Sequence, residues 1–208
     1  FINRMMFMKD YMLMGGAMSA MSGAYSFIRD FEAALKQTQA IAQGTEQQMG
    51  GLRKSIIDVS DSSRFSAIEL TEATTVLAQA GFSVSEIQKS LSSVATLATA
   101  TGSTLKDSVD IATSVMGAFK MSAESMPQVV NQITQAMNLS KLDVPKFMLA
   151  TQYAGNAASD LGVTFREMLS ATAAVSNTGI RSGSTMGTGM RQLLADLTAP
   201  TDKMKKKL

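Results

Sequence analysis

Helix start and stop signals recur along this chain at short intervals, and they constrain its fold more than any other feature. Ser66 and Glu69 stand three residues apart in the form of a capping box, in which a hydroxyl and a carboxylate bind free backbone N–H groups at the start of a helix. Gly81 follows that helix at a position where glycine commonly ends one in the left-handed conformation. The segment between these signals is therefore predicted to be helical.

The same punctuation continues towards the C-terminal part of the chain. Ser83 with Glu86 begins a second helix and Gly102 ends it, while Thr104 with Asp107 begins a third. Proline in the first turn of a helix leaves no intrahelical hydrogen bond unmade, and two of the three prolines fall at such positions. The remaining predicted signals are Ser122 or Ser125 with Pro127, Asp143 with Pro145, Thr164 with Glu167 and an end near Gly179, and a last helix from about residue 188 to Pro200.

Composition supports a fold made of helices alone. Good helix formers such as Ala, Met, Leu, Gln and Glu fill the segments between the signals, and Pro occurs only three times. No period-two alternation is sustained, and no Asn-Gly or Asp-Gly pair marks a β-hairpin. We therefore predict an all-α fold with no sheet. A long N-terminal helix is followed by antiparallel hairpins, with about eight or nine helices in all, several of roughly 12–18 residues.

Apolar spacing predicts buried helix faces, and one sequence pattern occurs twice. Residues 81–87 and 162–168 both carry Gly, an apolar residue, a hydroxyl, two variable residues, Glu and an apolar residue. A duplicated helix–turn–helix unit explains this echo, and so does the general likeness of any two capped hairpins. Two copies are too few to indicate a solenoid. The apolar sets that share a helix face are Ile87, Leu91, Val94 and Leu97, and Ile111, Val115 and Phe119.

The N-terminal segment differs from the rest of the chain. Residues 1–43 contain no Pro and no clear cap before Gly44, so they are predicted to form one helix of about 60 Å. Seven of the 17 Met fall in the first 21 residues, and residues 11–28 carry no charge. Small residues recur every four positions in two series, which are Gly15, Ser19 and Gly23, and Gly16, Ala20 and Ala24.

Three interpretations of this segment compete. Small residues four apart allow helix backbones to approach closely, and Met side chains adapt to irregular contacts, which favours a helix buried against copies of itself. Eighteen uncharged residues reach the lower limit for a membrane span, so a conditional membrane helix, buried in one state and inserted in another, is the main alternative. A secretory signal is disfavoured because the start is not strongly basic.

The sequence predicts three parts of the chain. Residues 1–43 are the predicted apolar helix, residues 44–200 a helical domain, and residues 201–208 a basic start of a further helix or a linker. The net charge of +2 depends on four lysines near the C-terminus, without which it would be −2. The body of the chain is therefore not a basic platform for nucleic acid.

The sequence offers little chemistry. Without Cys or His there is no thiol nucleophile, no Ser-His-Asp triad and no Cys- or His-ligated metal site, and we predict no enzyme activity, cofactor or metal. Two acidic pairs, Glu69 with Glu72 and Asp107 with Asp110, lie in first turns of predicted helices, where carboxylates complement the helix dipole. Helix capping explains both pairs better than catalysis.

A glycine-rich stretch, residues 177–191, precedes the last predicted helix. It lacks the Gly-Lys-Ser/Thr sequence and the preceding strand of a phosphate-binding loop. We interpret it as a tight, exposed turn in which Gly187 and Gly189 allow a helix to pack closely.

Eight short motifs occur in the order found in phage tail tape measure proteins, over about residues 30–204, and the chain resembles that family. They are Asp30-Phe31-Glu32, Arg64-Phe65-Ser66-Ala67, Leu77 to Ser83, Leu97 to Gly102, Ala118-Phe119 with Ser122-Ala123, Tyr153 with Leu161-Gly162, Asn177 to Gly183, and Met186 to Arg191 followed by Leu197 and Pro200-Thr201. The residues that carry the family pattern are Phe31, Phe65, Gly81, Phe82, Gly102, Phe119, Gly162, Gly179, Gly187, Thr188 and Arg191. The departures are Lys120 where glycine is usual, Met186 and Gly189 where alanine is usual, and Ala154-Gly155 in place of Ala-Pro.

The resemblance implies structural work in a virion. Tape measure proteins occupy the lumen of the tail tube, set its length and leave during genome ejection, and they are thought to help form a channel in the host envelope. The implied partners are further copies of the chain as a trimer or hexamer, tail tube proteins, tail tip or baseplate hub proteins, and the host membrane and DNA during ejection. The alternatives are a membrane-active pore or toxin component and a region of a tail-associated cell-wall hydrolase.

Overall fold

The computed structural model describes residues 26–180 and 182–198, and helices are the only regular structure in these ranges. The prediction of an all-α fold with no sheet is confirmed for this part of the chain. A helix over residues 26–42 comes first. It is followed by α2 (Glu46–Ser62), α3 (Ala67–Gln79), α4 (Val84–Thr101), α5 (Leu105–Ala118), a 3-10 turn η1 (Ala123–Ser125), α6 (Met126–Asn138), α7 (Val144–Asp160), α8 (Phe165–Asn177) and α9 (Gly183–Thr198).

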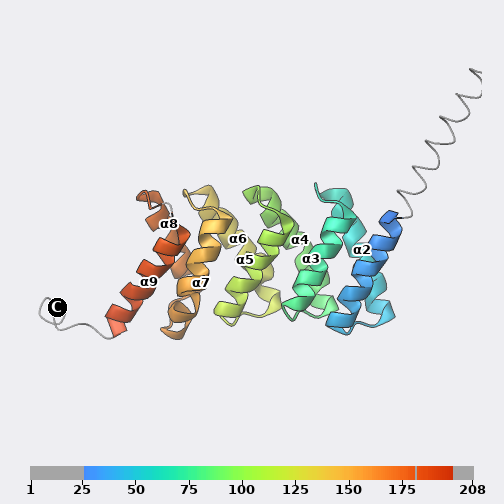
Figure 1. Cartoon of the computed structure of the whole chain (residues 1–208), viewed down its shortest axis with the longest axis horizontal. Coiled ribbons are helices and arrows are strands. Elements are labelled where there is room, and N and C mark those ends of the chain that lie inside the picture. The colour runs from blue at the N-terminus through green and yellow to red at the C-terminus, as the bar shows by residue number, and fades with distance from the viewer. Residues whose placement is uncertain (1–25, 181, 199–208) are drawn as a thin grey trace, which may run out of the picture.

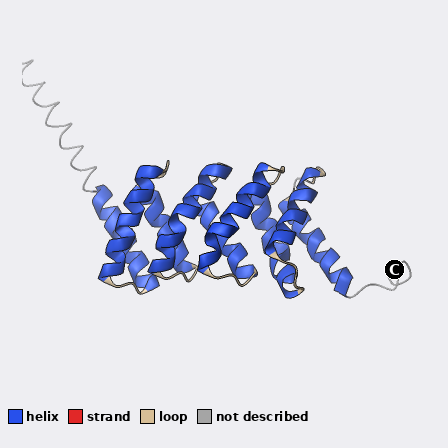
Figure 2. Cartoon of the chain, turned by 180° about the vertical axis from the view of Figure 1, so that it is seen from behind, coloured by secondary structure: helices blue, strands red, loops and turns tan. Residues whose placement is uncertain are grey.

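The helices stand side by side in two layers (Figure 1). The helix over residues 26–42 and the odd-numbered helices α3, α5, α7 and α9 form one layer, and α2, α4, α6 and α8 form the other. Each helix from α4 onwards packs on the helix two positions earlier in the chain. The view from behind shows short loops at both ends of the helices, and the array is elongated across the helix axes (Figure 2). Such stacking of helix pairs is the geometry of an α-solenoid.

Left-handed residues end helices of the first layer at regular intervals. After α3, Gly81 has φ +91°, its N–H donates to Ala78 O at 2.9 Å, and Phe82 N–H donates to Leu77 O at 3.1 Å. This pair of hydrogen bonds is the Schellman motif that the sequence predicts at Gly81. The backbone therefore reverses there without leaving the last carbonyl groups of α3 unpaired.

The same turn recurs after α5 and α7. Gly162 has φ +78°, and Val163 N–H donates to the carbonyl of Ala158 at 2.9 Å. Lys120 takes the equivalent position after α5 with φ +54°, and Met121 N–H donates to the carbonyl of Met116 at 2.8 Å. Lys120, which stands where the family pattern has glycine, is thus a non-glycine residue in the left-handed conformation.

These turns show that the internal echo belongs to a longer series. The left-handed residues Gln43, Gly81, Lys120 and Gly162 stand 38, 39 and 42 residues apart. Of these four positions only 81 and 162 carry glycine, so the sequence pattern reveals only that pair of turns. The described chain is a stack of helix pairs with a period of about 40 residues, within the range of helical solenoid repeats.

The predicted helix starts are confirmed with few changes. The three predicted capping boxes form at Ser66, Ser83 and Thr164, and a fourth forms at Thr45 with Gln48. Thr104 and Asp143 cap their helices, and Pro127 and Pro145 lie in first turns. Ser122 precedes η1 and Ser125 precedes α6, neither with a side-chain cap hydrogen bond. The last helix begins at Gly183, five residues before the predicted start.

The predicted apolar faces lie in the core between the layers. Of these side chains only Phe119 keeps partial exposure; Ile87, Leu91, Val94, Leu97, Ile111 and Val115 are all fully buried. The largest side chain with no exposure is Phe147 on α7. A continuous core links every helix of the array, because each layer covers the apolar face of the other.

The predicted N-terminal helix is described only in its last third. Residues 26–42 are helical, and the left-handed residue that follows is Gln43, next to Gly44. Residues 1–25 lie outside the described part of the chain, and with them all six small residues of the proposed contact, Gly15, Gly16, Ser19, Ala20, Gly23 and Ala24. Within the described ranges, no helix combines the length and apolar character that crossing a bilayer requires.

Candidate helix-stacking site

The second part of the glycine-rich stretch, from Gly183 onwards, forms the first turns of α9. Ser182 Oγ accepts a hydrogen bond from Thr185 N–H at 3.3 Å, and Ser182 O accepts one from Met186 N–H at 3.1 Å. Gly183, Gly187 and Gly189 therefore lie inside a helix and not in an exposed turn, which corrects our interpretation of this stretch. Glycine disfavours a helix interior, so a tertiary contact has to compensate for it.

Close contact with α7 provides that compensation. A Cβ atom at Gly187 would lie 2.7 Å from Tyr153 Cβ and 2.9 Å from Ala150 Cα. A Cβ atom at Gly183 would lie 2.7 Å from Lys146 Cα and would also overlap the carbonyl oxygen of that residue. Residues four apart share one face of a helix, so the two glycines form a groove that admits the backbone of α7.

The prediction for Gly187 is confirmed, and that for Gly189 is wrong. A Cβ atom at Gly189 would meet no atom within 4 Å. Gly183 has the role that we assigned to Gly189, and its spacing of four from Gly187 is the signal that identifies it. Of the two family residues that follow, Thr188 and Arg191 are both exposed on α9.

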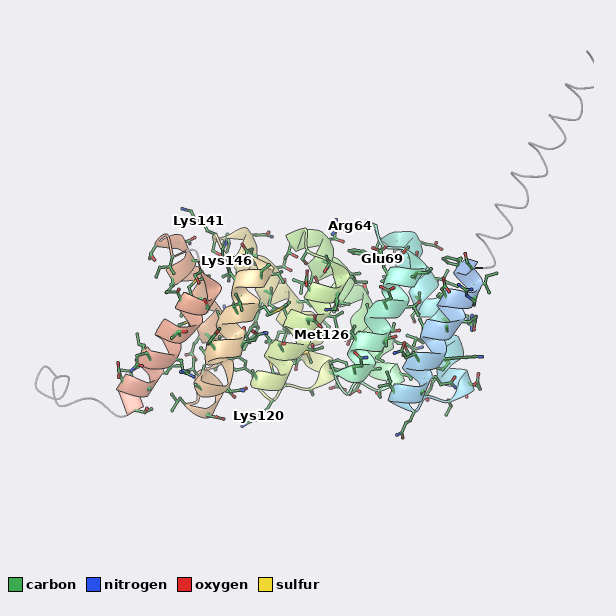
Figure 3. The ribbon with its side chains drawn as sticks, viewed as in Figure 1. Arg64, Glu69, Lys120, Met126, Lys141 and Lys146 are labelled. Atoms are coloured by element: carbon green, nitrogen blue, oxygen red, sulfur yellow. The ribbon has the colours of Figure 1, made fainter. Side chains whose placement is uncertain are left out.

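Hydrogen bonds fix the first turn of α7, the helix that packs against α9. The carboxylate of Asp143 accepts a hydrogen bond from Lys146 N–H at 2.9 Å and forms an ion pair with the ammonium group of the same residue. Lys146 Nζ also donates to Lys141 O at 3.3 Å, and Lys141 N–H donates to Asn177 Oδ1 at 3.0 Å. Lys141 in the loop before α7 and Lys146 in the first turn of α7 lie near the same end of the array (Figure 3). These bonds tie the loop before α7 to the end of α8.

Three aromatic residues, of which Phe119 belongs to the family pattern, pack together at the junctions between helix pairs. The ring centroid of Phe165 lies 5.7 Å from that of Phe119 and 6.3 Å from that of Phe147, with tilted planes. Phe165 begins α8, Phe119 follows α5 and Phe147 lies on α7, so the three rings join successive pairs. Tilted aromatic pairs at these distances are favourable beyond the area that they bury.

Arg64 binds the end of α4, a role that the motif did not reveal. Its guanidinium Nη2 donates to Ala98 O at 3.1 Å and to Ser103 O at 3.0 Å. The guanidinium carbon lies 4.8 Å from the ring centroid of Phe65. A cation at the C-terminal end of a helix complements its dipole and binds carbonyl groups that lack a partner in the helix. Arg64 and Glu69 lie near the same end of the array (Figure 3).

Polar contacts from Glu32 and Thr38 help to attach the helix over residues 26–42 to the array. The carboxylate of Glu32 forms a bidentate pair with the guanidinium of Arg53 on α2, and this hydrogen bond lowers the pKa of Glu32. The guanidinium carbon of Arg53 lies 5.6 Å from the ring centroid of Phe31, which is buried. Thr38 Oγ1, fully buried, lies 3.1 Å from Thr74 Oγ1 on α3.

The carboxylates of Glu69 and Glu167 cap helices, and that of Asp110 forms an ion pair. Hydrogen bonds from the backbone N–H and the hydroxyl of Ser66 lower the pKa of Glu69, and those of Thr164 lower the pKa of Glu167. Asp110 forms an ion pair with Lys106 at 3.3 Å. Across residues 26–180 and 182–198, no three side chains gather that could hold a metal ion.

Comparison with known proteins places the chain in a family. Residues 53–208, most of the sequence, match the family described as "Phage-related minor tail protein". The chain belongs to that family. The helix-stacking site, the Schellman turns after α3, α5 and α7, and the bond from Arg64 to α4 all lie within the matched residues.

Two relatives carry more specific names. The "Tape measure protein" of Pneumococcus phage Dp-1 is 28% identical over 179 residues, which are 86% of this chain and 16% of that protein. The "Probable tape measure protein" of Escherichia phage P2 is 27% identical over 191 residues, which are 90% of this chain and 23% of that protein. The chain thus spans less than a quarter of the length of either relative, and the resemblance to tape measure proteins is confirmed. No solved structure matches the chain significantly.

Proposed function

We propose that this chain is a structural segment of a phage tail tape measure protein. The observation that carries the proposal is that the match to a minor tail protein family and to two tape measure proteins extends over a continuous helical stack. The motif residues have structural roles in this stack: glycines lie at turns and close contacts, aromatic residues at junctions, and carboxylates at caps. The segment contributes shape and stiffness to a longer protein.

In this proposal the chain lies in the lumen of the tail tube during assembly, contributes to the length of the tail and leaves during genome ejection. Its partners are copies of itself, tail tube proteins and tail tip or baseplate hub proteins. An elongated array about as thick as two helix layers is suited to a tubular space, since helix axes in contact lie only about 8–10 Å apart.

Deletion of the stack tests the measuring role. Removing residues 45–198 in frame from the phage gene should shorten the tails that electron microscopy measures. A shortening of about 40 Å is expected if the four helix pairs stay folded and each adds about 10 Å. A shortening of about 230 Å would mean that these residues extend as one helix in the tail, at 1.5 Å per residue. Assembled tails of unchanged length would contradict a measuring role for this part of the protein.

We further propose that residues 11–28 join copies of the chain as a trimer or hexamer in the tail. Gly15, Ser19 and Gly23 would line the contact, since small residues four apart permit close helix packing. Ser19→Cys in intact particles should give oxidative cross-links between copies, while Cys at Tyr11, outside both small-residue series, should give fewer. No cross-link at position 19 in intact particles would refute this contact.

The same segment is proposed to enter the host envelope after ejection. Its 18 uncharged residues suffice for a short membrane helix. A peptide of residues 1–30 should leak dye from liposomes, and a peptide with Gly15→Lys and Ser19→Lys should not, because charge at the centre of a span opposes insertion. Equal leakage by both peptides, or leakage by neither, would refute insertion.

A further inference from the structure

An apolar groove lies at the C-terminal end of the described stack. It has a volume of about 490 Å³ and is lined by the end of α7, by α8 and by α9. Most of its walls are apolar, and its side chains include Leu161, Met168, Val175, Met190, Leu193 and Leu194. Leu193 is 60% exposed and Leu161 is 43% exposed, so the groove presents large apolar side chains to solvent.

Comparison with the preceding repeats shows that the position of Leu193 belongs to the core. Leu193 stands eleven residues after Ser182, the residue that precedes and caps α9. In α3, α5 and α7 the residue eleven positions after the N-cap has no exposure at all. Those three residues are Leu77, Val115 and Ala154. Leu193 is therefore an apolar residue at a position that is buried in α3, α5 and α7 and exposed in α9.

In the earlier pairs, the helix that bears this core residue packs against the next helix along the chain. Helices α4, α6 and α8 each place a buried apolar residue in their first turns, and it follows the core residue by 10, 11 and 14 positions. These residues are Ile87, Met126 and Met168. Ala154 and Met168 belong to one buried cluster, so the α8 residue closes the core position on α7.

The chain after α9 repeats this spacing. Met204 stands eleven residues after Leu193, the same distance that separates Met126 from Val115. Leu208 follows Met204 by four residues, so both would share one face of a helix. The neighbouring residues are Lys203, Lys205, Lys206 and Lys207, whose charged ends require solvent and whose stems can border an apolar contact.

We propose that residues 201–208 begin a further helix of the even-numbered layer, which packs beside α8 and places Met204 over Leu193. The occupant of the groove is thus the same chain and not a second copy or another tail protein. The basic end of the sequence would be the outer face of that helix, and the stack of helix pairs would continue past α9 without a break.

A disulfide designed across the contact tests this proposal. The 208-residue chain contains no Cys, so the double variant L193C/M204C has one thiol pair. A bridge requires Cα atoms about 4.4–6.8 Å apart, which packing of Met204 over Leu193 would provide. Mild oxidation should give an intramolecular disulfide in most molecules, seen as an unchanged monomer mass with two thiols lost. The matched pair L193C/K206C, with Lys206 on the opposite side of the helix, should oxidise at least tenfold more slowly.

Three outcomes would overturn the proposal. Equal oxidation of the two pairs would mean that the segment has no fixed contact with Leu193. Disulfide-linked dimers would mean that a second copy fills the groove. Absence of a bridge in either pair, in variants that retain the circular dichroism and unfolding midpoint of the parent, would mean that the segment lies elsewhere. Hydrogen exchange of the unmodified protein gives an independent readout. Amides of residues 205–208, the first that can donate within a helix beginning at residue 201, should be protected, and Leu193→Asp should remove that protection. Exchange of these amides in the parent at the unstructured rate would refute docking.

Discussion

At the scale of single residues, glycines of one helix have opposite roles. Gly187 on α9 faces α7, and a methyl group there would overlap Ala150 and Tyr153. Gly189, two residues later, faces open space. The family pattern includes Gly187, and this close contact is the physical reason why an alanine would not serve there.

Alanine substitutions should separate these roles. Gly187→Ala should lower the free energy of unfolding by about 1–3 kcal/mol, because the new methyl group forces α9 away from the backbone of α7. Gly189→Ala is the matched control and should raise it by up to about 1 kcal/mol, since alanine is the better helix former. Urea unfolding followed by circular dichroism measures both. A loss at position 189 equal to that at 187 would contradict the assignment of the contact.

Lys120 is the residue that departs most from the turn chemistry of its neighbours. It holds φ +54° where Gly81 and Gly162 take the same conformation without a Cβ atom. Lys120→Gly should therefore raise the free energy of unfolding by about 1 kcal/mol. Lys120→Ala, which also removes the exposed contact with Asp160 at 3.4 Å but keeps Cβ, should change it by less than about 0.5 kcal/mol. The same unfolding assay applies, and equal effects of the two changes would mean that conformation is not the cause.

At the scale of helices, capping boxes define where α2, α3, α4 and α8 begin. In α3 and α8 the pKa of the box carboxyl lies below its ordinary value of 4.5, because the ionised form accepts hydrogen bonds from the N-cap residue. Glu69 and Glu167 are the two carboxyls concerned. A lowered folded-state pKa contributes stability that is complete above the unfolded pKa and is lost as the pH falls through the folded value.

Removing these two titrations should flatten the acid side of the stability curve. The double variant E69Q/E167Q should lose less stability than the parent between pH 5 and pH 3, because glutamine still caps the helix but does not take up a proton. Urea midpoints at several pH values measure the difference. Glu72→Gln is the control, since Glu72 lies on α3 outside the capping box. A double variant with the same pH dependence as the parent would refute this contribution.

At the scale of the whole molecule, the stack joins helix pairs that mainly contact their neighbours. Stability in such an array is approximately the sum of each unit and its nearest-neighbour contacts. Helices in the middle, α4 to α7, have neighbours on both sides, whereas the helix over residues 26–42 and α9 lie at the two ends of the described stack.

Hydrogen exchange should therefore be graded along the array. Amides of α4 and α5 should exchange more slowly than those of α9 and of residues 26–42, because terminal units open without disrupting a second interface. Mass spectrometry of peptic fragments resolves these segments. Uniform protection from residue 26 to residue 198 would instead indicate one cooperative unit and would contradict the nearest-neighbour description.

The positions of the helices and most of their boundaries could be predicted from the sequence. Those features are local: a hydroxyl and a carboxylate three residues apart form a cap at Ser66 or Thr164 wherever the chain runs. Tertiary structure was needed to show that the helices stack in two layers with a repeat of about 40 residues, because two of the four left-handed turns, at Gln43 and Lys120, carry no glycine to mark them. It also decided that α9 begins at Gly183, since a glycine-rich helix start forms only where the backbone of α7 fills the space that side chains would occupy. The partner of Arg64 was hidden for the same reason, as the carbonyl that it binds lies 34 residues away on α4 and no spacing rule connects them.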